Sequence, residues 1–154
     1  MKKKIKNVLA VLGALALLSG LFLDFRDIRN IFKKQVEISG EWHFNFQVKE
    51  SSYNSYIDTV TEYKIYFIQD GQKVTGEGEK WKYKGEPLPY KEHDPIQITG
   101  TIINDTLYCK YNLKGLLRET TGNFKSYINN NQLIGVFSGT AANVKGNFNA
   151  IKIP

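Results

Sequence analysis

Aromatic and cationic side chains that suit nucleotide binding lie near the ends of several expected strands. An aromatic ring stacks on the flat face of a base, and a guanidinium pairs with two phosphate oxygens at once. Arg118 is the only arginine after residue 36, where the other Lys/Arg positions are all lysine. The residues expected to contact a ligand are Tyr56, Trp81, Tyr83, Tyr111, Arg118 and Lys145.

Each of these assignments has a structural alternative. The rings of Trp81, Tyr83 and Tyr111 would equally well fill the interior of a small β-barrel. Arg118 would equally well pair with the neighbouring Glu119 or with Asp58.

Residues of the types used in catalysis are few and scattered. The lone Cys109 alternates with Leu107, Tyr111 and Leu113, which is the pattern of a buried small hydrophobe. One thiol makes neither an intrachain disulfide nor a structural zinc site, and the two histidines, His43 and His93, lie fifty residues apart. The sequence therefore predicts no enzyme, no metal site and no cofactor.

The positive charge lies almost entirely at the start of the chain. The 154 residues carry a formal net charge of +6. Eight of the 21 Lys and Arg residues but only two of the 15 Asp and Glu residues precede Glu37, so the remainder carries thirteen of each sign. Binding to DNA or RNA needs clustered cations on the folded domain, so neither is expected as a partner.

The N-terminal region predicts a membrane anchor. Residues 8–23 are uncharged and apolar, and Ile5 and Phe25 extend them towards the roughly 20 residues that a spanning helix needs. We expect a single transmembrane helix with a basic flank over residues 1–23, with a cleaved signal peptide as the alternative. Residues 24–36 place apolar residues at helical spacing between basic ones, which predicts an amphipathic juxtamembrane linker or an ordinary linker helix.

From residue 37 to residue 154 the chain alternates apolar and polar residues, as half-buried strands do. Eight such runs are expected, and their order predicts an all-β fold, an eight-stranded antiparallel up-and-down barrel. They cover residues 38–49, 58–69, 72–83, 95–103, 106–113, 117–127, 132–139 and 143–153.

The connections predict one closed and one open end. Short polar turns at 70–71, 104–105 and 129–131 would close the end where the N-terminal segment attaches. Long connections at 50–57 and 84–94 fall at the opposite end, where a binding site is expected. The wider set of residues near this mouth includes His93, Ser138 and Asn143, whereas Trp42 is expected in the core.

The run Gly40-Glu41-Trp42 at the start of the first strand resembles the Gly-x-Trp start of calycins, the lipocalin and avidin type of barrel. The arginine that lipocalins carry on the last strand is absent here. That strand has Lys145 and Lys152 instead.

The layout of a small barrel behind a membrane segment resembles the membrane-tethered β-barrel effectors of bacterial cyclic-oligonucleotide antiphage signalling (CBASS). This resemblance implies a bacterial inner-membrane, single-pass protein whose cytosolic barrel binds a cyclic dinucleotide, and which then forms a homo-oligomer and disrupts the lipid bilayer. It also implies base stacking by Trp81, Tyr83 or Tyr111 and phosphate pairing by Arg118. The alternative is an extracytoplasmic calycin-like module that binds an apolar ligand or a protein partner, because charges flank the apolar segment evenly and leave the orientation open.

Overall fold

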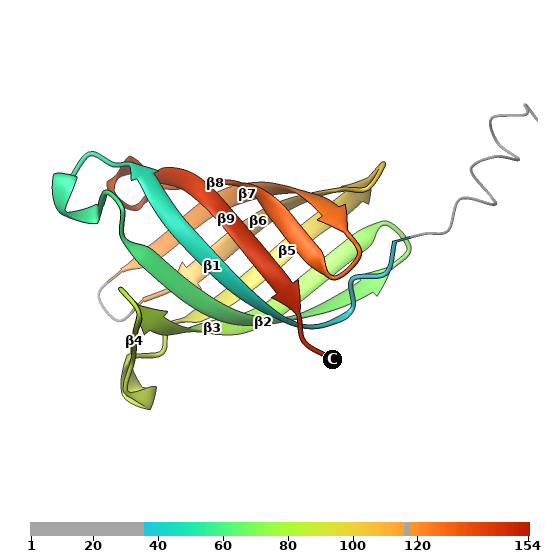
Figure 1. Cartoon of the computed structure of the whole chain (residues 1–154), viewed down its shortest axis with the longest axis horizontal. Coiled ribbons are helices and arrows are strands. Elements are labelled where there is room, and N and C mark those ends of the chain that lie inside the picture. Colours follow the sequence, from blue (N-terminus) through green and yellow to red (C-terminus); the bar gives the residue numbers. More distant parts are fainter. Residues whose placement is uncertain (1–35, 116–117) are drawn as a thin grey trace, which may run out of the picture. The chain divides into compact units, whose positions relative to one another are not determined.

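The computed structural model describes residues 36–115 and 118–154, which form an antiparallel β-barrel (Figure 1). The predicted anchor, 1–23, and all of the predicted linker except Val36 lie outside the described residues. Among the described residues, no helix has both the length and the apolar character needed to cross a membrane. The nine strands are β1 (Gly40–Glu50), β2 (Val60–Asp70), β3 (Lys73–Tyr83), β4 (Glu86–Pro87), β5 (Pro95–Ile103), β6 (Thr106–Lys114), β7 (Glu119–Asn129), β8 (Gln132–Gly139) and β9 (Lys145–Lys152).

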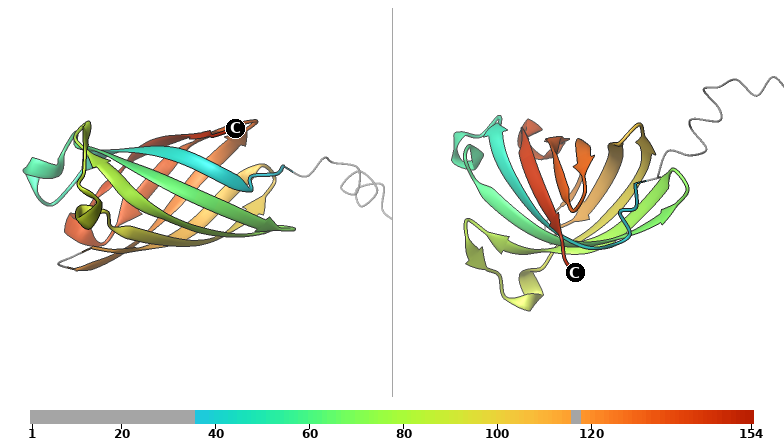
Figure 2. Two further views of the ribbon diagram at one scale, coloured as in Figure 1. Left: turned by 90° about the horizontal axis from the view of Figure 1, so that it is seen from below. Right: turned by 45° about the vertical axis from the view of Figure 1, so that its right-hand side comes forward.

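Eight long strands close the barrel, as the sequence predicts. Each pairs with its neighbours in chain order, and β1 closes the circle by pairing with both β2 and β9. The two-residue strand β4 pairs with β3 outside this circle and was not predicted. The two views in Figure 2 show the strands wrapping round one interior. Three short 3-10 helices lie in the connections: η1 (Asn54–Tyr56), η2 (Tyr90–Glu92) and η3 (Ala141–Asn143).

Phenylalanine rings fill the middle of the barrel. Phe44 and Phe46 of β1 point inward and pack on Phe148 of β9, with ring centroids 5.5 and 4.9 Å away. Phe124 of β7 meets Phe148 edge to face at 5.3 Å. Such aromatic pairs add to the stability that burial of their area provides, so the barrel is a packed core at its centre rather than an open tube.

Glycines on the inward face make room for these rings. A Cβ atom on Gly146 would lie only 2.0 Å from the carbonyl oxygen of Gln47 and 2.7 Å from the ring of Phe137. At Gly122 it would lie 2.1 Å from the carbonyl oxygen of Ser138 and 2.3 Å from the hydroxyl of Tyr111. The predicted role of strand glycines, close approach in a small barrel, is therefore seen at these two positions.

Tight turns close one end of the barrel. Asn104 and Asp105 both have positive φ angles, 48° and 61°, as a two-residue hairpin of the primed type requires. Gly71 and Asn130 supply the positive φ angles of the other two turns, 59° and 51°. We call this the closed end.

The segment before β1 seals the closed end. Ile38 and Trp42 are fully buried there, and the indole Nε1 of Trp42 donates a hydrogen bond of 2.7 Å to the carbonyl oxygen of Ile38. The side chain of Gln69 accepts from the backbone N–H of Ile38 at 2.9 Å and donates to the carbonyl oxygen of Val36 at 2.9 Å. Lys152 of β9 lies opposite Trp42 and holds its Nζ atom 6.0 Å from the ring.

The Gly-x-Trp motif therefore lies at the closed end of the barrel, where the ammonium group of Lys152 lies over the ring of Trp42. Gly40 has a φ angle of 121°, and a Cβ atom there would meet the Lys152 side chain at 3.2 Å. Trp42 lies in the core, as predicted.

Candidate functional site

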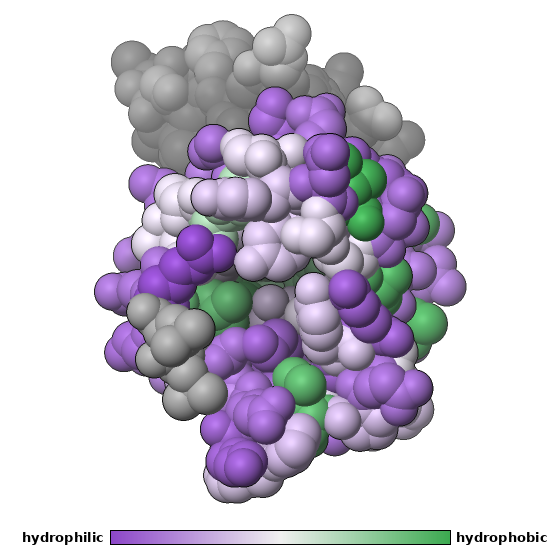
Figure 3. All heavy atoms as spheres, turned by 90° about the vertical axis from the view of Figure 1, so that its left-hand side faces the viewer, coloured by the Kyte–Doolittle hydropathy of each residue, from purple (hydrophilic) through white to green (hydrophobic). Residues whose placement is uncertain are grey.

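The open end carries the longer connections, with η1, β4, η2 and η3 (Figure 1). Inside it lies a cavity of about 880 Å³. Figure 3 faces this end, where the surface is hollowed and hydrophobic side chains are visible within the hollow. The lining residues that matter for the argument are aromatic (Phe46, Tyr56, Tyr63, Tyr83, Tyr111, Phe137) or charged (Lys80, Lys91, Glu92, Asp94, Arg118).

Four of the six residues predicted to contact a ligand line this cavity together. They are Tyr56 from η1, Tyr83 at the end of β3, Tyr111 in β6 and Arg118 just before β7. Segments from four separate parts of the chain therefore bring three tyrosine rings and a guanidinium to one cavity.

Trp81 lies outside the set that lines the cavity, because it continues the outward series of Thr75, Glu77 and Glu79 in β3. Tyr63 of β2 pairs with Lys80 and Glu62 pairs with Lys82, so Trp81 is an extra residue between the two pairs. This bulge reverses the alternation after Trp81, so that Lys82 points outward and Tyr83 points into the barrel. Trp81 turns outward between Lys64 and Lys82, whose Nζ atoms lie 4.5 and 4.1 Å from its ring.

Lys145 also lies outside the set that lines the cavity. Its neighbour Gly146 faces inward in β9, so Lys145 faces outward, and its Nζ atom lies 3.2 Å from Glu50 Oε2 on the exposed wall. The predicted mouth residues Ser138, Asn143 and His93 also lie outside the set that lines the cavity. His93 instead lies in the loop before β5, with Nε2 3.1 Å from the carbonyl oxygen of Leu88 and Nδ1 3.1 Å from Oε2 of Glu79 in β3.

A buried ion pair inside the cavity was missed by the sequence analysis. Lys80 Nζ and Asp94 Oδ2 are in direct contact, and their side chains are 22% and 10% exposed. Lys80 continues the inward series of Val74, Gly76 and Gly78 in β3 and pairs with the inward-facing Tyr63. No pattern in the sequence marks Asp94 as the partner of Lys80. The two charges cancel, so this ion pair adds polarity but no net charge to the cavity.

Two tyrosine hydroxyls in the cavity remain protonated at neutral pH. Burial raises the pKa of Tyr111 to about 12. Burial, followed by repulsion from Tyr111 and Asp94, raises the pKa of Tyr63 well above its usual range. Tyr111 donates its hydrogen bond to the carbonyl oxygen of Ser138 at 3.1 Å. The Tyr63 hydroxyl has no hydrogen-bond partner among the described residues, which leaves a donor for a ligand. The alternation of β2, with Ile65 and Phe67 buried, is the signal that would have found Tyr63.

Arg118 is exposed at the mouth, and the two partners considered for it are engaged elsewhere. Asp58 Oδ1 lies 3.3 Å from Lys49 Nζ, and Glu119 accepts a hydrogen bond from Asn112. Neither Arg118 nor Lys91 forms an ion pair with any residue between 36 and 154 that the structure describes. Both cations are therefore available to an anionic group.

Cys109 faces inward in β6 and is 5% exposed, as its alternation predicts. Burial raises the pKa of its thiol to about 12, which leaves little of the reactive thiolate at neutral pH. Across residues 36–115 and 118–154, no three His, Cys, Asp or Glu side chains are grouped closely enough to share a metal ion.

No model of a known protein family and no curated protein sequence matches the chain. Among solved structures, the chain is similar to a redesigned β-barrel, mFAP1, which was solved bound to DFHBI. The TM-score is 0.53 at 10% sequence identity, over 75% of this chain and 94% of the other. This likeness concerns the fold alone and agrees with an eight-stranded antiparallel barrel.

Proposed function

We propose that the barrel binds a small ligand at its open end, with the ligand's flat or apolar body among the tyrosine and phenylalanine rings and an acidic group on Arg118. The observation that carries this proposal is an unpaired guanidinium at the mouth of an aromatic cavity of about 880 Å³. Cavities of roughly 300–1,000 Å³ with a few convergent polar groups are the usual form of small-molecule sites. We propose binding without chemical conversion of the ligand.

The geometry gives the ligand three kinds of contact. The rings of Tyr56, Tyr83 and Tyr111 offer flat apolar surface, and the free Tyr63 hydroxyl offers one buried donor. Arg118 offers a planar pair of donors, which suits a carboxylate or a phosphate. The redesigned barrel solved with DFHBI supports the idea that a barrel of this fold accommodates a small molecule.

The finer proposal is that the ligand is a cyclic dinucleotide and that its binding drives assembly of a membrane-anchored antiphage effector. Two features support it: a cyclic dinucleotide has two bases to stack and two phosphates, and the cavity lining offers several tyrosine rings and two unpaired cations, Lys91 and Arg118. In this proposal the bases stack on Tyr56, Tyr83 or Tyr111, while Trp81, on the outer wall, is left out. Anchoring in the bacterial inner membrane, a cytosolic barrel and homo-oligomer formation belong to the same proposal.

The competing candidate is an apolar ligand with a single acidic group, carried outside the cytosol. It is favoured by the aromatic lining and by the neutralisation of Lys80 by Asp94, which leaves few charges deep in the cavity. One binding experiment can therefore distinguish the two candidates. It tests cyclic dinucleotides in one arm and fatty or aromatic monocarboxylates in the other.

Substituting Arg118 with alanine is expected to weaken binding of an acidic ligand about 10- to 100-fold, because a hydrogen bond to a charged group contributes roughly 1.5–3 kcal/mol. The measurement is a thermal-shift screen of the full chain against cyclic dinucleotides of adenine and guanine and against monocarboxylates. Titration calorimetry on every hit then compares wild type with Arg118→Ala.

Lys145→Ala is the matched control, since it removes a cation of the outer wall and should leave the dissociation constant unchanged. If no compound in either arm raises the melting temperature, the proposed function is wrong. If a compound binds Arg118→Ala as tightly as it binds the wild type, Arg118 does not hold its acidic group. A cyclic dinucleotide hit that also weakens on Lys91→Ala would support the finer proposal.

A further inference from the structure

Exposed hydrophobic side chains are unevenly distributed over the outer wall of the barrel. Large hydrophobic side chains that point outward from the strands and stay exposed gather towards the closed end. They are Tyr66, Ile68, Ile103, Tyr108, Tyr127, Ile134, Val136 and Ile151.

Five of these residues form one surface on neighbouring strands, which we call the closed-end patch: Ile103, Tyr108, Tyr127, Ile134 and Val136. Tyr127 of β7 lies directly opposite Ile134 of β8. Thr106 of β6 lies between Tyr127 and Ile103 of β5 and pairs with both. Each of the five side chains is between 42% and 61% exposed. Contiguous exposed apolar surface of this kind marks an interaction site more often than isolated exposed residues do.

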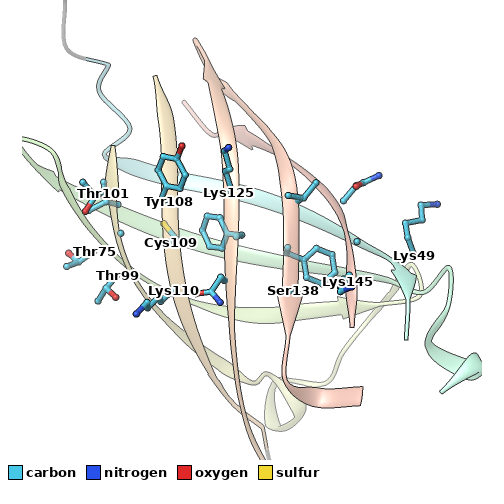
Figure 4. A pocket seen from close by; sticks show the side chains of 18 of the residues that line it. Lys49, Thr75, Thr99, Thr101, Tyr108, Cys109, Lys110, Lys125, Ser138 and Lys145 are labelled. Atoms are coloured by element: carbon cyan, nitrogen blue, oxygen red, sulfur yellow. The ribbon is translucent and has the colours of Figure 1, made fainter. Parts of the chain in front are cut away.

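Lysines accompany the closed-end patch. Lys73, Lys110 and Lys125 line a shallow groove of about 1030 Å³ that runs across the strands between two rows of side chains (Figure 4). Lys125 holds its Nζ atom 5.3 Å from the ring of Tyr108. The groove lining contains one carboxylate, Glu50, which lies 3.2 Å from Lys145 at its far end. The part of the groove next to the patch is therefore basic.

We infer that the closed-end patch and its lysines dock on the surface of a lipid bilayer that contains acidic lipids. Tyrosines with isoleucines suit the boundary between headgroups and acyl chains, and lysines beside them attract acidic headgroups. The chain enters the barrel through Val36 at the closed end, and the sequence before it contains the apolar run 8–23. In the proposed membrane-anchored protein, the anchor would therefore join the barrel at the same end that carries the patch.

This inference rests on the membrane anchoring in the proposed function and is independent of the identity of the ligand. The cavity opens at the other end of the barrel, so docking of the closed-end patch would leave the mouth clear of lipid. A second copy of the chain or another protein are the competing occupants of the patch, and the experiment distinguishes them.

A single fluorescent label on the full chain tests the inference. Because Cys109 is buried, a polarity-sensitive thiol dye can be directed to Thr106→Cys, within the patch, or to Asn45→Cys, on β1 across the barrel. On adding vesicles of phosphatidylcholine with phosphatidylglycerol, the dye at position 106 is expected to shift to the blue and the dye at position 45 to stay unchanged. Lys73→Glu combined with Lys125→Glu should raise the acidic-lipid concentration needed for half of the shift about tenfold or more.

Three outcomes would overturn the inference. The first is no shift at position 106 with acidic vesicles, and the second is an equal shift at both positions, which would reflect general attachment of the chain. The third is a shift at position 106 that grows with protein concentration in the absence of vesicles, which would assign the patch to a second copy of the chain.

Discussion

Trp42→Ala is expected to lower the free energy of unfolding by about 3–5 kcal/mol, the usual cost of removing a large aromatic side chain from a core. Trp42 is fully buried at the closed end, and its indole bonds the carbonyl oxygen of Ile38 at 2.7 Å. Its loss would leave a cavity beneath Ile38 and also remove the ring over which Lys152 lies. Urea denaturation followed by circular dichroism measures the change.

The chain provides a matched control in its second tryptophan. Trp81 lies half-buried on the outer wall, where its ring contacts His43 and two flanking lysines, so Trp81→Ala should cost less, about 1–2 kcal/mol. Equal losses for the two variants, or a larger loss for Trp81→Ala, would contradict the placement of these two residues.

Stability is expected to fall by about 5 kcal/mol between pH 8 and pH 11, because three buried groups release their protons later in the folded state than in the unfolded state. Burial raises the pKa of Cys109 from 9.0 to about 12 and that of Tyr111 from 10.0 to about 12, and Tyr63 shifts in the same direction. From pH 9 upward the unfolded chain therefore binds fewer protons than the folded one. Between its pKa in the unfolded chain and its pKa in the folded protein, each such group lowers the free energy of unfolding by roughly 1.4 kcal/mol per pH unit.

The slope of stability against pH, measured by urea denaturation at pH 8 to 11, separates the contributions of Cys109 and Tyr111. Cys109→Ala should make the slope shallower from pH 9, and Tyr111→Phe should do so only above pH 10. Tyr127→Phe is the control, since Tyr127 is 61% exposed and should leave the slope unchanged. Identical slopes in the wild type and the three variants would show that these buried groups do not govern alkaline unfolding.

Alternation along the chain was sufficient to predict the barrel. All eight long strands start and end within two residues of their predicted positions, and the three turns of the closed end lie where they were expected. This success has a physical reason: each strand has one face in the core, so a single slip would expose its whole apolar set. The buried positions of Trp42 and Cys109 follow from the same alternation.

The candidate site was predicted only in part, because one of its residues depends on a departure from alternation and others depend on side-chain positions. The bulge opposite Glu62 and Tyr63 turns Lys82 outward and Tyr83 into the barrel, and nothing in the sequence marks it. Tyr83 reaches the cavity because it follows the bulge. Arg118 was found because it is chemically unlike the other cations, whereas its freedom from Asp58 and Glu119 depends on side-chain positions that the sequence does not specify.

The two ends of β1 and β9 give the barrel a directional response to mechanical force. Trp42 of β1 and Lys152 of β9 face each other at the closed end, so a pull between the two termini would open the β1–β9 ladder one rung at a time. A pull between Val36 and a point at the open end runs along β1 instead. It would have to break the ladders to β2 and β9 together, after releasing the hydrogen bonds that Gln69 makes to Val36 and Ile38. The barrel is therefore expected to resist tension between Val36 and its open end far better than tension between the start of β1 and the end of β9.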